Sequence, residues 1–228
     1  MPRHRRISPD GFVQHIVNRG DHRETVFHKP GDFRVFLRII AEVASAVPMR
    51  ILAYCIMRNH FHLLLWPHEG ADLPVFMDRL MNRHIKRYLR HYPPASPGHI
   101  YQGRYTNALV ETGRAVITTA KYIESNGSSA GLVERAEHYP WSSASPEHDE
   151  PGRPILAEWP VPKPADWLTF LNTPTPADEL KRLRRSLRRG SPYGSHQWID
   201  AVVKEHGLEH TVRKPGRPRV YETFLPTE

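Results

Sequence analysis

Two histidines separated by one residue stand in an apolar stretch of the sequence. The segment NHFHLLLW contains His60 and His62, and most of its other residues are large and hydrophobic. In a β-strand, side chains at positions i and i+2 leave the same face, so both imidazoles can reach one metal ion while Phe61 and Leu63 face the core. The alternative is a pair of partly exposed histidines on a sheet face, with no ligand.

A tyrosine and an asparagine with helical spacing follow further along the chain. Tyr122 and Asn126 are four residues apart in KYIESN, so a helix would place them one turn apart on the same face. A tyrosine hydroxyl, with a pKa of about 10, is a poor nucleophile without help, and a metal ion beside a phosphate provides such help. Asn126 could give that metal a neutral oxygen ligand. Alternatively, Tyr122 packs its ring in the core.

Hydrophobic periodicity predicts the elements that carry these residues. In chain order we expect strands at 12–19, 50–57 and 61–66, helices at 32–47, 73–91 and 113–126, and a hairpin or extended strand at 100–111. Gly127 is expected to end the last of these helices. The order of the elements predicts an α+β fold, a ferredoxin-like antiparallel sheet with helices packed on one face.

The composition changes after Ser145. Residues 146–178 contain eight prolines and are predicted to form a linker, which leaves residues 1–145 as the first domain. Residues 179–228 are predicted to be a basic C-terminal extension with two short helices, ADELKRLRRSLRRG and SHQWIDAVVKEHG. Gly190 and Gly207 should end these two helices.

The overall composition restricts the class of protein. The formal net charge is +8 and the pI is about 9.8, which favours a polyanionic partner such as nucleic acid. The single cysteine, Cys55, excludes a disulfide within the chain and fits a reducing compartment. Because no apolar run is long enough to span a bilayer, we expect a soluble, cytoplasmic protein associated with the nucleoid.

Taken together, several stretches resemble the REP-associated tyrosine transposases, a branch of the histidine–hydrophobic–histidine (HUH) superfamily of IS200-like single-strand transposases. They are HIVNRGDHRETVF, AYCIMRNHFHLLL, YQGRYTNALVE, KYIESNGSSAGLV and HYPWSSA, in that order. The resemblance covers roughly residues 8–145. The sequence departs from the family at one point, because the family usually has Asn-Pro where this chain has Asn126-Gly127.

The resemblance implies a role for each matching residue. His60 and His62 would be ligands of a divalent cation, with Asn126 as the third ligand. Tyr122 would attack a DNA phosphate, which leaves a 5′-phosphotyrosine link and a free 3′-hydroxyl. Magnesium or manganese suits these ligands together with phosphate oxygens, whereas a closed zinc site would need a fourth protein ligand and usually cysteines. Tyr101 and Tyr105 are rival nucleophiles, but neither has an oxygen ligand one helical turn away.

Basic side chains supply candidate DNA contacts. The RKPGRPR segment resembles an AT-hook, which lays extended arginines in a narrow minor groove, although a basic tail used only for nonspecific attraction is an alternative. A solvated charged face is the alternative for the basic helix at 73–91. The predicted DNA-binding residues are Arg83, Lys86, Arg87, Arg104, Lys121, Arg213, Arg217 and Arg219.

The sequence therefore predicts a transposase that cuts and rejoins single-stranded or hairpin DNA through a 5′-phosphotyrosine intermediate, acting as a monomer or homodimer. A hairpin-binding regulator without catalytic activity is one alternative. A relaxase-like nicking enzyme is another, and a metallonuclease that uses water instead of tyrosine is a third.

Overall fold

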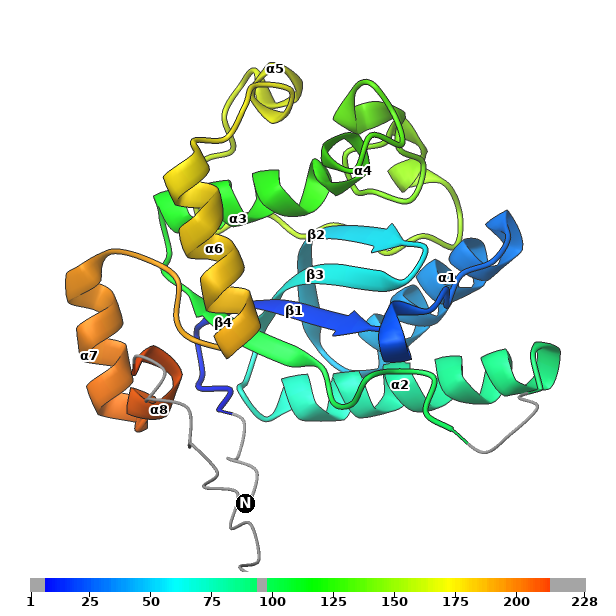
Figure 1. Cartoon of the computed structure of the whole chain (residues 1–228), viewed down its shortest axis with the longest axis horizontal. Helices are drawn as coiled ribbons and strands as arrows, with labels where there is room; N and C mark the ends of the chain where they lie inside the picture. The colour runs from blue at the N-terminus through cyan, green and yellow to red at the C-terminus, as the bar shows by residue number, and fades with distance from the viewer. Residues whose placement is uncertain (1–6, 94–97, 214–228) are drawn as a thin grey trace, which may run out of the picture.

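A computed structural model describes residues 7–93 and 98–213 of the chain. Four strands in this part form one antiparallel sheet in the order β2-β3-β1-β4 (Figure 1). They are β1 (Val13–Arg19), β2 (Met49–Met57), β3 (His60–Pro67) and β4 (Thr106–Val110). This strand order is that of the ferredoxin-like arrangement, so the α+β class and the antiparallel sheet are confirmed.

Helices cover both faces of the sheet, whereas the sequence predicted helices on one face only. The helices are α1 (Pro30–Ala46), α2 (Asp72–His91), α3 (Arg114–Glu124), α4 (Asn126–Ser129), α5 (Trp167–Leu171), α6 (Ala177–Arg189), α7 (His196–His206) and α8 (Glu209–Val212). Helices α1 and α2 share a core with Phe61 and Leu63 of β3. Helix α3 packs with Leu64 on the opposite face (Figure 1). The physical reason is that β2 is buried at almost every position, so both of its faces must be covered.

Helix α1 shows how the sequence specifies its elements. Its apolar residues recur at helical spacing, and Phe33, Phe36 and Leu37 are buried against the sheet. Asp32 closes the first turn, because its carboxylate accepts hydrogen bonds from the backbone N–H groups of His28 and Lys29. No helix in the described part of the chain has the length and apolar character needed to cross a membrane.

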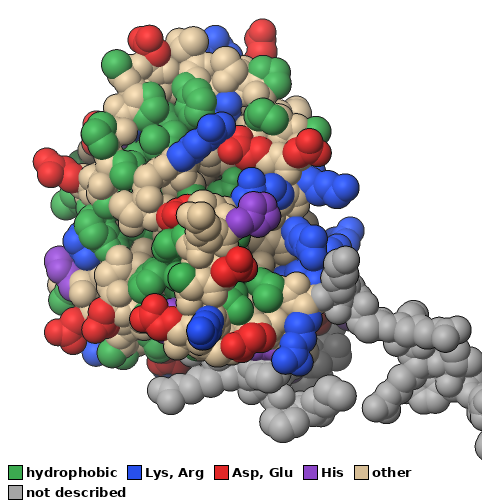
Figure 2. All heavy atoms as spheres, turned by 90° about the vertical axis from the view of Figure 1, so that its left-hand side faces the viewer, with side chains coloured by type: hydrophobic (Ala, Val, Ile, Leu, Met, Phe, Trp, Pro, Cys, Tyr) green, Lys and Arg blue, Asp and Glu red, His purple; other side chains and the backbone are tan. Residues whose placement is uncertain are grey.

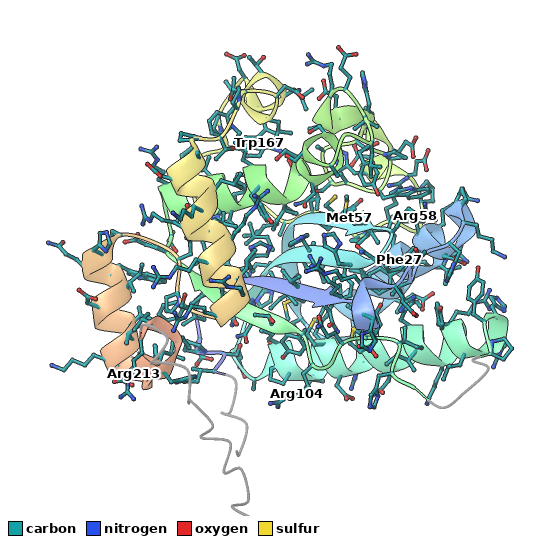
Figure 3. All side chains as sticks on the ribbon, viewed as in Figure 1. Phe27, Met57, Arg58, Arg104, Trp167 and Arg213 are labelled. Carbon is teal, nitrogen blue, oxygen red and sulfur yellow. The ribbon has the colours of Figure 1, made fainter. Side chains whose placement is uncertain are left out.

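Residues 146–178 do not form a separate linker but pack on the main domain. Trp167 is 6% exposed and belongs to the same core as α3, and its side chain lies between α5 and α3 (Figure 3). The indole N–H of Trp159 donates to the backbone oxygen of Leu52 at 3.1 Å, which ties this segment to β2. The prolines limit regular structure here to short helices such as α5, and burial of the tryptophans between the prolines is favourable because it removes apolar surface from water.

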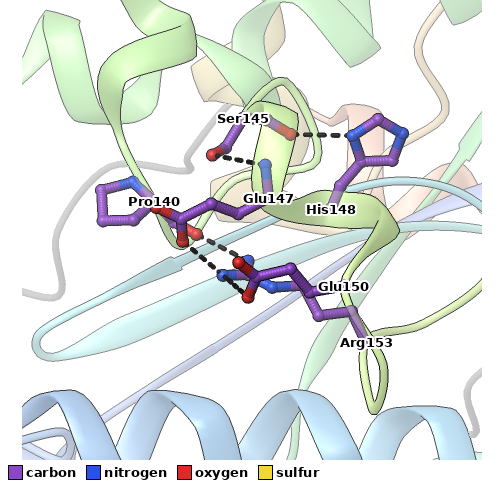
Figure 4. A network of polar contacts seen from close by, with 6 residues as sticks. All are labelled: Pro140, Ser145, Glu147, His148, Glu150 and Arg153. Atoms are coloured by element: carbon purple, nitrogen blue, oxygen red, sulfur yellow. Dashed lines mark hydrogen bonds and ion pairs between the residues drawn. The ribbon is translucent and has the colours of Figure 1, made fainter.

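A buried arginine holds the start of this segment (Figure 4). The guanidinium of Arg153 donates to the backbone oxygen of Pro140 at 2.6 Å and to the carboxylate of Glu147 at 2.7 Å. Glu150 lies 3.8 Å from the same guanidinium. Because the Arg153 side chain is only 6% exposed, these charge-assisted bonds are poorly screened by solvent. They fix residues 140–153 as a compact turn.

The basic C-terminal helices pack beside β4. Tyr193 exchanges backbone hydrogen bonds with Leu109 and Glu111, so residues after α6 extend the pairing of the edge strand. Gly190 and Gly207 adopt left-handed φ angles of 64° and 65° and end α6 and α7, as predicted. The C-terminal helices therefore cover an edge that would otherwise expose unpaired backbone groups.

Burial of His84 predicts a stability that depends on pH. His84 of α2 stacks on Phe27 and shares a 2.8 Å hydrogen bond with the hydroxyl of Tyr101. Burial lowers the pKa of His84 to about 4. The unfolded chain then binds this proton at a higher pH than the native state does, so the stabilisation is present above about pH 6.5 and is lost as the pH falls toward 4.

We expect the free energy of unfolding of the wild type to fall about 1–2 kcal/mol more between pH 7 and pH 5 than that of His84→Gln, which lacks this proton. Urea denaturation at both pH values measures the difference. Equal pH dependence in the two proteins would show that folding does not lower the pKa of His84.

Candidate active site

The alternation of β3 places both histidines on the face that α3 covers. Phe61 and Leu63 point to the opposite face and are fully buried there, as the spacing predicted. The rings of His60 and His62 have centroids 5.1 Å apart and are almost perpendicular. His62 is 3% exposed, whereas His60 is partly open to solvent at the end of the strand.

Helix α3 brings Tyr122 to these histidines. The helix packs on the sheet through Val116, Ala120 and Ile123, which are fully buried. This packing leaves Tyr122 beside His62, with ring centroids 5.6 Å apart and perpendicular planes. Tyr122 is only partly buried, so its side chain remains accessible from solvent.

Asn126 is the first residue of α4, which follows directly after the helix that carries Tyr122. Its side-chain nitrogen donates to the backbone oxygen of Tyr122 at 2.7 Å and to that of Ile123 at 3.3 Å. The amide nitrogen is therefore bound to the helix backbone, and Oδ1 is the side-chain atom available to a ligand. Asn126, Tyr122 and His60 line one cavity of about 660 Å³.

His15 is a member of this cluster that the sequence analysis missed. Its Nε2 lies 2.9 Å from Nδ1 of His62, and both side chains are buried. One of these nitrogens donates and the other accepts, so this contact orients the His62 ring. The signal in the sequence was the alternation of β1, which puts His15 on the same face as Val13 and Val17.

The protonation states suit metal ligands. Burial, with a smaller contribution from nearby Arg19, lowers the pKa of His60 to about 4. Burial, followed by the neighbouring His15 and His60, holds the pKa of His62 well below its usual value. Both rings are therefore neutral at physiological pH, which is the form that binds metal. Nδ1 of His60 is 2.6 Å from Oδ1 of Asn59, so this contact engages Nδ1 and not Nε2.

Arginines surround the cavity. Arg19 of β1 lies opposite His60 in the strand register, and Arg104 precedes β4 (Figure 3). Helix α6 contributes Arg184 and Arg188 to the same lining. Of these four arginines, only Arg104 was among the predicted DNA contacts. Arg19 could have been found from strand alternation, but nothing local to α6 shows which residues it faces.

The other predicted DNA contacts lie elsewhere. Arg83, Lys86 and Arg87 are exposed on α2, which packs on the sheet face opposite the histidines, and Arg83 forms a 3.2 Å salt bridge with Glu42.

Lys121 is 4% exposed. Its ammonium group donates to Thr173 at 2.9 Å and lies 4.1 Å from the Phe170 ring centroid, away from the cavity. Arg213 follows α8 at the molecular surface (Figure 3), and Arg217 and Arg219 lie outside the described residues.

The rival tyrosines are less suitable as nucleophiles. Tyr101 is buried in the core on the opposite face and shares its hydroxyl with His84. Tyr105 lines a neighbouring cavity beside α2.

Within the described residues no group of three His, Cys, Asp or Glu side chains could hold a metal ion, so a site built on His60 and His62 needs a ligand of another type. An amide oxygen is a donor of that type, and Asn126 lines the same cavity as His60.

Gly127 does not end the tyrosine helix as predicted. Helix α3 stops at Glu124, and Gly127 lies inside the short helix α4 without a left-handed φ angle. Glycine is required here for packing, because a Cβ atom on Gly127 would lie 2.6 Å from Cβ of Tyr139 and touch its ring. Tyr139 in turn donates its hydroxyl to the backbone oxygen of Ile56 at 2.9 Å, which anchors this contact to β2.

Comparison with known proteins adds the following. The family model described as "Transposase IS200 like" matches residues 10–126, just over half of the chain. A solved structure of a REP-associated tyrosine transposase bound to a REP hairpin shares 21% identity and covers 63% of this chain and 82% of that chain, with a TM-score of 0.50. A putative transposase from Deinococcus radiodurans R1 shares 18% identity over 58% of this chain and 92% of its own, with a TM-score of 0.37. No curated protein matches the chain.

The close approach at Gly127 gives a testable prediction. Gly127→Ala should lower the free energy of unfolding by about 1–3 kcal/mol, because the added methyl group overpacks against Tyr139. Gly31→Ala is the matched control, since Gly31 also lies in a helix but has open space around its Cα. We expect the control to be neutral or to stabilise by up to about 1 kcal/mol. Urea denaturation measures both, and equal effects would contradict the packing role.

Proposed function

Because the chain belongs to the IS200-like transposase family, we propose that it cuts and rejoins single-stranded or hairpin DNA through Tyr122. The observation that supports this proposal best is the position of Tyr122, whose ring is 5.6 Å from that of His62. His60 and Asn126 line the same cavity. The cluster combines a nucleophile with ligands for a cation, as covalent phosphoryl transfer requires.

The proposed reaction exchanges one phosphodiester bond for another. The Tyr122 oxygen loses its proton to solvent and forms a bond to phosphorus, while the bond from phosphorus to the 3′-oxygen breaks and the 3′-hydroxyl takes up a proton. The 5′-phosphotyrosine conserves the bond energy, so a 3′-hydroxyl of another strand can reverse the step without an external energy source. Partial burial of Tyr122 restricts its ring, which lies against the rings of His15 and His62.

We propose that His60, His62 and Asn126 hold Mg²⁺ or Mn²⁺. The donors fit such an ion, because two neutral imidazole nitrogens and an amide oxygen leave room for phosphate and water. A bound cation would supply charge neutralisation at the scissile phosphate. The protein contributes the orientation of the rings, through Asn59 for His60 and His15 for His62.

The proposed substrate is a DNA hairpin with a single-stranded flank. The REP-associated tyrosine transposase with the same fold was solved bound to a REP hairpin. The net charge of +8 and the arginine-lined cavity are consistent with a DNA ligand. Since one chain places Tyr122 beside His62 and His60 beside His62, we propose that a monomer can carry out the cleavage step.

Replacing the nucleophile tests the proposal directly. Tyr122→Phe should abolish covalent protein–DNA product while hairpin binding changes little, because the ring and its packing remain. The measurement is a denaturing gel after incubation with single-stranded genomic fragments and Mn²⁺. Tyr105→Phe is the matched control and should form adduct like the wild type. Adduct formed by Tyr122→Phe would disprove the assignment, and a wild type that binds hairpins without forming adduct would point to a regulator.

The role of His15 predicts an effect on metal affinity. His15→Leu should weaken Mn²⁺ binding about 10- to 100-fold, because the His62 ring loses the partner that orients it. Electron paramagnetic resonance of free Mn²⁺ measures the affinity without DNA or turnover. His15→Gln, which can still form a hydrogen bond, should recover part of the loss, and His84→Gln on the opposite face should bind like the wild type. Unchanged affinity in His15→Leu would remove His15 from the site.

A further inference from the structure

Helix α6 forms one wall of the cavity that contains Tyr122. It lies outside the segment matched by the transposase family, yet Arg184, Leu187 and Arg188 line the cavity together with His60 and Tyr122. In Figure 1 this helix crosses in front of the sheet close to β1 and β4. The C-terminal region therefore completes the cavity and is more than an appended tail.

Helix α6 is held firmly in this position. Leu183 is 2% exposed and belongs to the core that contains α3. Ser186 is buried, and its hydroxyl donates to the backbone oxygen of Ser191. Arg182 and Arg189 donate to the backbone oxygens of Gly194 and Thr211, which ties the helix to the segments that follow it. These contacts orient the cavity-facing side of the helix.

Arg184 and Arg188 differ from these anchoring arginines. Within the described part of the chain, neither guanidinium has a hydrogen-bond or ion-pair partner, and both side chains are exposed. They are four residues apart, so they lie on one face about 6 Å apart along the helix axis. A pair with this spacing can contact neighbouring phosphates of one strand, and each planar guanidinium can bind phosphate through two hydrogen bonds.

The charge of the cavity lining favours an anion. Arg19 and Arg104 line the cavity together with Arg184 and Arg188, and the described residues that line it include no Asp or Glu. Figure 2 shows Lys and Arg side chains gathered along one side of the face turned to the viewer, which is the left-hand side of Figure 1. Cations concentrated in a hollow without acidic partners attract phosphates more strongly than the same cations spread over a surface.

We propose that Arg184 and Arg188 are a phosphate-binding pair that holds the single DNA strand next to the scissile phosphate. The proposal rests on the proposed function and assigns a DNA contact to the C-terminal helix. The simpler explanation of a basic α6 is a solvated face whose charges complement the helix dipole. That explanation gives all exposed cations of α6 the same role. Arg184 and Arg188, however, line the cavity, whereas Lys181 and Arg185 do not.

The helix provides its own matched control. The double variant Arg184→Ala/Arg188→Ala loses two charges from the cavity side, and Lys181→Ala/Arg185→Ala loses two from exposed positions outside the cavity lining. Binding of a fluorescein-labelled oligothymidylate is measured by anisotropy over a series of salt concentrations. Both variants are made in the Tyr122→Phe background, so that no cleavage disturbs the equilibrium, and their folding is checked by thermal denaturation.

We expect the cavity variant to bind about 10- to 100-fold more weakly at low salt. The slope of log K against the logarithm of the salt concentration should also become shallower by about 1.4, because each phosphate contact in single-stranded DNA contributes about 0.7 to it. In the control variant this slope should change by less than half as much. Arg184→Lys/Arg188→Lys, which keeps both charges, should retain most of the slope. When the same two substitutions are made in the protein that retains Tyr122, covalent adduct should form more slowly than in the wild type.

Equal losses in the two alanine variants, or a cavity variant that binds like its parent, would overturn the proposal. The binding measurement does not depend on tyrosine chemistry. A wild type without any covalent product would therefore contradict the proposed function while the phosphate-binding pair could still be confirmed or rejected.

Discussion

Contact between α3 and the histidine-bearing face of the sheet is the constraint on which the site depends. Val116, Ala120 and Ile123 bring the helix close to β2 and β3, and small side chains such as Ala120 permit a short distance between the layers. That distance sets the separation of Tyr122 from His62. A change in the packing of α3 would move the nucleophile relative to both histidines, although neither the tyrosine nor the histidines had changed.

A buried carboxylate, that of Glu124, anchors the last turn of α3 through hydrogen bonds. The Glu124 side chain accepts hydrogen bonds from the Ser143 hydroxyl and from the Trp167 indole, both at 2.6 Å. Burial raises the pKa of Glu124, and these donors oppose that rise. Because Ser143 also bonds to the backbone of Tyr54 in β2, this network links the tyrosine helix to the sheet and to α5. Residues beyond the segment matched by the family thus help to hold the helix that carries Tyr122.

The site separates two kinds of environment within a short distance. His15 and His62 are buried and neutral, so each ring can donate through one nitrogen and accept through the other. The cavity beside them is open and lined by arginines that remain charged. Tyr122 is partly buried and stands at the boundary between the two environments. The fold thus places buried, neutral imidazoles directly beside a cavity lined by arginines.

The sequence by itself determined the features that depend on neighbouring residues. Strand alternation put His60 and His62 on one face, and helical spacing put Tyr122 and Asn126 on another, because backbone geometry sets both periodicities within a few residues. Only the tertiary structure decided which faces meet. It placed His15 against His62, buried Lys121 under Phe170, and brought Arg184 of α6 into the cavity. These contacts join segments far apart in the chain, so they follow from how whole layers pack, which no local pattern of residues encodes.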